Sequence, residues 1–119
     1  MYNNEEMNAI NATLGQGFVL RLSDYIMNKR KTAILVKRVS DGYVVITLRY
    51  KDSKHGGYIP VAYVEHYVVT ENGANTTHGV TLEIGSECPT QDFEVIKSKT
   101  FLVDVDYLVN IGENIEVKH

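Results

Sequence analysis

The stretch TAILVKRVSDGYVVITLRY, from Thr32 to Tyr50, decides the fold. Two segments rich in β-branched and aromatic residues flank the turn Ser40-Asp41-Gly42, which places a glycine where a tight turn favours positive φ. Apolar runs of this length on both sides of such a turn are typical of an antiparallel β-hairpin. The sequence therefore predicts a β protein built around this hairpin.

A turn centred on Asp41 would assign each side chain of the hairpin to one of two faces. The core face would then hold aliphatic residues, namely Ile34, Val36, Val44, Ile46 and Leu48. The opposite face would mix aromatic, cationic and aliphatic side chains, namely Leu35, Lys37, Val39, Tyr43, Val45, Thr47 and Arg49. Such a mixture is typical of protein interfaces, so Lys37, Tyr43 and Arg49 are predicted to contact a partner.

The segment YIPVAYVEHYVVT, Tyr58 to Thr70, is apolar on both faces of a strand. One face would carry Ile59, Val61, Tyr63, Tyr67 and Val69. Two interpretations are open: the strand bends between two packed sheets, or another chain covers its outer face. On the second interpretation the contact residues are those of the other face: Tyr58, Ala62, Val64, His66 and Val68.

The remaining chain predicts one helix and several further strands. Asn3 can cap a helix over residues 1–15, and the apolar stripe of Met7, Ile10 and Leu14 would dock on the sheet or on a neighbouring subunit. Alternating segments predict further strands at 18–22, 80–84, 93–97, 100–109 and 115–118. We expect a single domain, 1–119, in which residues 17–119 form an antiparallel sandwich or small barrel of about eight strands.

Charge is divided unevenly along the chain. Residues 1–60 hold nine cations and five acids, whereas residues 61–119 hold three cations and ten acids. Basic and acidic surfaces can pair between subunits, the basic part can bind nucleic acid, or the charges can simply be solvated. The cations Lys29, Arg30 and Lys31 are predicted contact residues on either of the first two interpretations.

Neither a catalytic nor a cofactor motif is found, so we expect a protein without enzymatic activity or cofactor. Asp104 and Asp106 would leave the same face of a strand, where paired carboxylates can hold a divalent cation. The favoured interpretation is an outward polar face in plain alternation, so no metal site is predicted. The spacing of His66, His78 and Cys88 matches no known zinc pattern.

One cysteine, no signal-like start and no long apolar run favour a cytoplasmic protein, or one assembled into a particle in the cytoplasm. We expect a binding or assembly protein that contacts itself or another protein, such as a structural or accessory component of a virus, phage or mobile element. A module for single-stranded DNA or RNA that uses residues 29–54 is the main alternative. A β-barrel that binds a small ligand is a further one.

Overall fold

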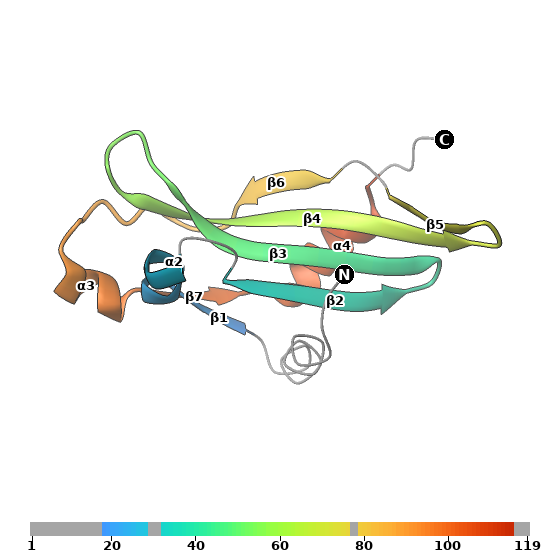
Figure 1. Ribbon diagram of the computed structural model, residues 1–119, viewed down its shortest axis with the longest axis horizontal. Coiled ribbons are helices and arrows are strands. Elements are labelled where there is room, and N and C mark those ends of the chain that lie inside the picture. Colours follow the sequence, from blue (N-terminus) through green and yellow to red (C-terminus); the bar gives the residue numbers. More distant parts are fainter. Residues whose placement is uncertain (1–17, 29–31, 77–78, 116–119) are drawn as a thin grey trace.

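The computed structural model describes residues 18–28, 32–76 and 79–115 and shows two antiparallel sheets with three short helices among them (Figure 1). The elements follow in the order β1 (Phe18–Arg21), α2 (Leu22–Asn28), β2 (Ala33–Val39), β3 (Gly42–Asp52), β4 (Tyr58–Thr70), β5 (Gly73–Thr76), β6 (Val80–Glu83), α3 (Phe93–Ser98), β7 (Thr100–Val103) and α4 (Val105–Glu113).

The larger sheet is built on the long pair β3 and β4. β2 pairs with the edge of β3 that β4 does not occupy. On the other side of the pair, β6 and β5 share the second edge of β4: β6 pairs with residues 61–64 and β5 with residues 67–70. β4 therefore stays within one sheet instead of bending between two. Pro60 fits in this central strand because its carbonyl accepts from Ile84 N at 2.9 Å, just beyond the end of β6.

A second layer covers one face of this sheet, which we call the core face. It consists of α4 and the ribbon formed by β1 and β7, and Figure 1 shows α4 behind the strands β3 and β4. On the ribbon, Leu20 and Val103 point to the core and Val19 and Leu102 point away. The two sheets pack as a sandwich and do not close into a barrel.

The register of the β2–β3 hairpin corrects one half of the predicted faces. Val39 pairs with Gly42, so the turn contains only Ser40 and Asp41 and Val36 lies opposite Val45. The prediction was right for β3, where Val44, Ile46 and Leu48 are fully buried. It was wrong for β2, because the predicted three-residue turn centred on Asp41 differs from the observed two-residue turn by one position in the register. In the observed register Leu35, and not Ile34, lies on the core face.

The predicted faces of β4 were also interchanged. Ala62 and Val64 are fully buried and His66 is 3% exposed, all on the core face, with Tyr58 and Val68 half-buried on the same side. The odd-numbered residues form the other face. Both faces of β4 are apolar, so the sequence pattern alone offers no basis for choosing between them.

Two predicted strands are wholly or partly helical. Residues 93–98 form α3; of the predicted strand 100–109, residues 100–103 form β7 and the rest belongs mainly to α4, Val105–Glu113. α2 was not predicted at all. The carboxylates of Asp92 and Asp104 accept from Glu94 N and Tyr107 N, which satisfies backbone donors at the first turn of each helix. The described residues form seven strands, not eight. The predicted helix over residues 1–15 and nearly all of the predicted strand 115–118 lie outside the described ranges.

Helix α4 packs unusually close to the sheet at Gly112. A Cβ atom at this position would lie 2.4 Å from Val44 Cγ1 and 3.0 Å from Val64 Cγ1. Both valines are fully buried and β-branched, so their methyl groups have little freedom to move.

We expect Gly112→Ala to lower the free energy of unfolding by about 1–3 kcal/mol, because overpacking outweighs the gain in helix propensity of about 1 kcal/mol. Denaturant unfolding measures the change, with Glu113→Ala, at an exposed neighbouring position, as the control. A Gly112→Ala protein as stable as the parent would contradict this close approach.

The environment of Tyr50 predicts that the protein becomes less stable toward unfolding at alkaline pH. Its hydroxyl donates to Leu20 O at 3.2 Å, and burial, with a smaller effect from Cys88, raises the pKa of Tyr50 to about 12. The ordinary pKa is 10, so the unfolded chain loses this proton first and stability falls as the pH rises from about 10 to 12. Tyr50→Phe should cost about 1 kcal/mol at pH 7 and show a shallower decline above pH 10. Parallel declines in the two proteins would show that Tyr50 is not the group responsible.

Candidate functional site: the outer sheet face

The face of the larger sheet opposite the core is the strongest candidate for a functional surface. The register brings together side chains from the three longest neighbouring strands, and we call this set the outer sheet face. It comprises Ile34, Val36, Tyr43, Val45, Thr47, Arg49, Val61, Tyr63, Glu65 and Tyr67.

The outer sheet face has a closed centre and an exposed aromatic margin. Val61 is 1% exposed and Val45 is 5% exposed, yet neither belongs to the core cluster on the other side. Tyr43 and Tyr63, in contrast, are 40% and 37% exposed. Exposed tyrosines around buried aliphatic side chains resemble the composition of protein interfaces, where an aromatic ring offers apolar area and a polar tip.

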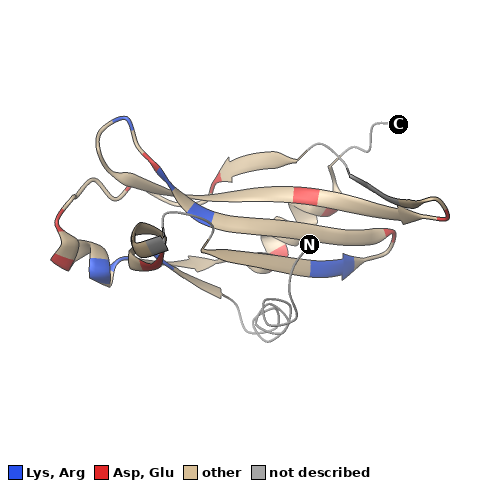
Figure 2. Cartoon of the chain, in the orientation of Figure 1, with Lys and Arg blue, Asp and Glu red and all other residues tan. Residues whose placement is uncertain are grey.

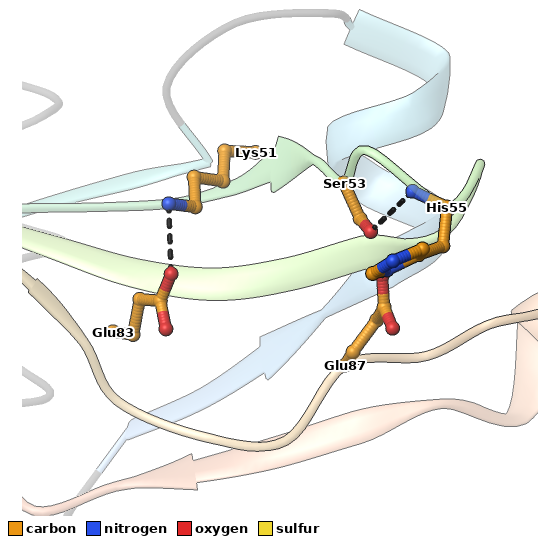
Figure 3. Close-up of polar contacts among 5 residues, drawn as sticks. All are labelled: Lys51, Ser53, His55, Glu83 and Glu87. Carbon is orange, nitrogen blue, oxygen red and sulfur yellow. Dashed lines mark hydrogen bonds and ion pairs between the residues drawn. The ribbon is translucent and has the colours of Figure 1, made fainter.

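An ion pair crosses one end of this face. Lys51 on β3 reaches over β4 to Glu83 on β6, with 2.8 Å between Lys51 Nζ and Glu83 Oε1 (Figure 3). Val61 lies directly between Arg49 and Glu83 in the register, so the pair passes close to it. Both side chains are about half exposed, and we therefore expect the pair to contribute less than about 1 kcal/mol.

The loop between β3 and β4 continues this polar end of the sheet. Ser53 Oγ accepts from His55 N at 3.0 Å, and His55 Nδ1 lies 3.8 Å from Glu87 Oε1 (Figure 3). Gly57 permits a close approach here, because a Cβ atom would lie 2.2 Å from Cys88 O. These contacts hold the loop against the segment that follows β6.

At the opposite end, Asp41 and His66 connect the β2–β3 turn to β4. Asp41 Oδ1 lies 2.7 Å from His66 Nε2, and Asp41 O accepts from Val69 N at 2.8 Å. The imidazole is buried and the carboxylate is about half exposed.

Tyr67, on the outer sheet face, donates to Glu65 Oε2 at 3.3 Å, and burial together with this carboxylate raises the pKa of Tyr67.

Two edge strands of the larger sheet carry charges of opposite sign (Figure 2). Lys37 and Arg38 are exposed on β2 at one edge, and Glu83 is exposed on β6 at the other. The central strands β3 and β4 carry charges of both signs, including Arg49 and Glu65.

The structure brings together only some of the residues predicted to contact a partner. Tyr43 and Arg49 lie on the outer sheet face, whereas Lys37 is exposed near the end of β2 on the core side. Ala62, Val64 and His66 are buried and unavailable for contact, and Tyr58 packs edge-on to Tyr25. Six further predicted residues lie outside the described ranges: Met7, Ile10, Leu14, Lys29, Arg30 and Lys31. The prediction did not include Val61, Tyr63 and Tyr67, which lie on the outer sheet face, because it placed the even-numbered residues of β4 on that side.

The candidate metal ligands are differently placed from the prediction. Asp104 caps α4 and Asp106 lies in its first turn, so the two do not share a strand face. His66 pairs with Asp41, Cys88 is buried beside Tyr58, and His78 lies outside the described ranges. No group of three metal-ligating side chains occurs among the described residues. In the same part of the chain, no helix has the length and apolar character needed to cross a membrane.

Comparisons with protein-family models, with curated proteins and with solved structures find no match to this chain.

Asp41 is expected to stabilise the end of the sheet. Asp41→Ala removes the carboxylate beside a buried imidazole, which should lower the free energy of unfolding by about 1–3 kcal/mol. Asp41→Asn keeps an oxygen acceptor and should lose less, and Ser40→Ala, in the same turn, should change stability by less than about 0.5 kcal/mol. Equal losses for the alanine and asparagine variants would contradict a role for the hydrogen bond.

Proposed function

We propose that this chain is a non-enzymatic assembly protein whose outer sheet face makes contacts with other copies of itself or with another protein. One observation carries the proposal: exposed Tyr43 and Tyr63 surround buried aliphatic residues on a sheet face, while α4 and the β1–β7 ribbon both occupy the opposite face. A monomer gains nothing from aromatic rings in water, but an interface gains their buried area.

Electrostatics supports a contact that is mixed in character. Arg49 and Glu65 lie on the same face as the tyrosines, and Arg is favoured at interfaces because it forms several hydrogen bonds while its stem packs against apolar groups. The single cysteine, which is free and buried, suits a reducing compartment, and we propose that assembly takes place in the cytoplasm or in a particle formed there.

Sedimentation velocity over a range of concentrations tests this proposal. We expect the mean mass of the parent protein to rise with concentration and that of Tyr63→Lys to rise much less, because a cation at this position would be buried without a partner. Phe93→Lys, at an exposed aromatic position on α3, is the matched control and should associate like the parent. Identical behaviour of Tyr63→Lys and the parent would contradict the proposed surface.

A second candidate function rests on the same tyrosines. Tyr43, Tyr63 and Tyr67 share a face with Arg38 and Arg49, and aromatic rings beside cations are what single-stranded nucleic acids stack upon. Fluorescence anisotropy with a labelled single-stranded oligonucleotide should then show affinity that falls steeply with salt. Arg38→Ala together with Arg49→Ala should flatten this dependence, and a lack of binding at low salt would rule the candidate out.

A further inference from the structure

Three strands of the larger sheet have an edge that no described strand occupies. β2 pairs only with β3, and β5 and β6 each pair only with β4, within residues 18–28, 32–76 and 79–115. β2 lies on one side of the β3–β4 pair, and β5 and β6 lie on the other (Figure 1). β5, with the sequence GANT, carries no charge, whereas β2 and β6 carry charges of opposite sign. An open strand edge presents unpaired backbone donors and acceptors and is a template for another strand.

The register identifies the backbone groups at each edge. In a two-residue hairpin the closing pair, Val39 and Gly42, exchanges hydrogen bonds, and bonded pairs then alternate along the strands. The amide and carbonyl groups of Ile34, Val36 and Arg38 are therefore directed to the open edge of β2. On β6, Ile84 N bonds to Pro60 O, so the same alternation directs the groups of Thr81 and Glu83 to the open edge.

The open edge of β6 also borders a hollow of about 240 Å³ between β6, β7 and α4. Leu82 and Ile84 line it on one side and Leu102 and Tyr107 on the other. Leu102 is 70% exposed and Tyr107 is 58% exposed, so the lining of this hollow includes large apolar groups that are in water. A chain added beside β6 would remove part of this surface from water.

Charge and side-chain direction indicate which strand fits beside β6. β2 carries Lys37 and Arg38 and no acid, whereas β6 carries Glu83 and no cation, and Asp104 lines the hollow. The edge residues of both strands place their side chains on the outer sheet face, so a β2–β6 pair would continue that face without a break. Pairing β2 with a second β2 would instead place Lys37 and Arg38 of both copies in one strand pair with no acidic residue to compensate them.

We infer that the open edge of β2 in one copy pairs with the open edge of β6 in the next, head to tail. This inference rests on the proposed assembly function and names its partner as a second copy of the chain. The contact joins two different surfaces, so it generates a ring if the rotation closes and a filament if it does not. In either case the outer sheet faces of successive copies become one extended surface.

Proline substitution at each edge tests the inference directly. Val36→Pro and Thr81→Pro each remove an amide that is directed to the open edge and takes no part in the ladder inside the sheet, a position where edge strands tolerate proline. Circular dichroism and thermal unfolding verify that each variant is folded. We expect each variant alone to sediment as a monomer, or as a small face-to-face oligomer, at concentrations where the parent forms larger species.

Mixing the two variants is the decisive measurement. Val36→Pro keeps an intact β6 edge and Thr81→Pro keeps an intact β2 edge, so a 1:1 mixture can form one edge contact but cannot extend it. We expect the mixture to gain a species of twice the mass of the variants alone, and no longer series. A mixture with the mass distribution of the separate variants would overturn the inference.

Thr100→Pro is the matched control. Leu22 N bonds to Lys99 O, so the amide of Thr100 points away from β1 toward the open edge of β7, which the inference does not use. This variant should assemble like the parent. If the Val36 and Thr81 variants also assemble like the parent while Tyr63→Lys does not, the edge inference fails and the proposed outer-face function stands. If none of these variants differs from the parent, both fail.

Discussion

The pairing of β3 with β4 is the constraint on which the rest of the structure depends. Eleven consecutive residue pairs join them, from Gly42 opposite Val68 to Asp52 opposite Tyr58. Because side chains alternate along a strand, this one register assigns every residue of both strands to the core face or to the outer sheet face. A slip by one residue would turn one strand over relative to the other, so that either Val44 or Val64 would leave the core face and α4 would lose part of the surface on which it packs.

The two faces meet different physical requirements. The core face is closed by close packing: Gly112 lets the backbone of α4 approach Val44 and Val64 more closely than any side chain would permit. The outer sheet face has no such layer among the described elements. Its centre at Val45 and Val61 is buried, whereas Tyr43 and Tyr63 remain partly exposed.

The hairpin, the strand Tyr58–Thr70 and the mainly β character could be predicted from the sequence, because long apolar runs flanking a Ser-Asp-Gly turn leave few other structures open. The face on which each side chain lies could not be predicted, because it depends on whether the turn contains two residues or three. Contacts between residues distant in sequence, such as Asp41 with His66, help to stabilise one turn over the other. The helix α4 was missed for a related reason. Val105 and Val109 satisfy both an alternating and a helical period, and only Leu108 favours the helix. The capping contact of Asp104 becomes visible only in the structure.

The assignment of side chains to the two faces also explains which of the proposed contact residues could be predicted from the sequence. Tyr43 and Arg49 lie on β3, whose face the prediction assigned correctly, whereas Ala62 and Val64 lie on β4, where it was reversed. Tyr63 and Tyr67 were consequently overlooked, although their residue type is the one that interfaces favour. For a strand that is apolar on both sides, the neighbour with a clear turn is therefore the better guide to orientation than the strand's own composition.

The distribution of charge is consistent with a sheet whose edges have to be controlled. Natural β proteins place charges on open edges, and lysine and arginine on β2 discourage pairing between two β2 strands. β6 carries the opposite sign in Glu83, which also forms an ion pair with Lys51 of its own chain. In the inferred arrangement the cations of β2 would lie beside this carboxylate, so charges of opposite sign would favour the pairing of β2 with β6 over the pairing of β2 with β2. The uneven division of charge along the sequence is related to this arrangement, because the edge strand β2 belongs to the basic half of the chain and the edge strand β6 belongs to the acidic half.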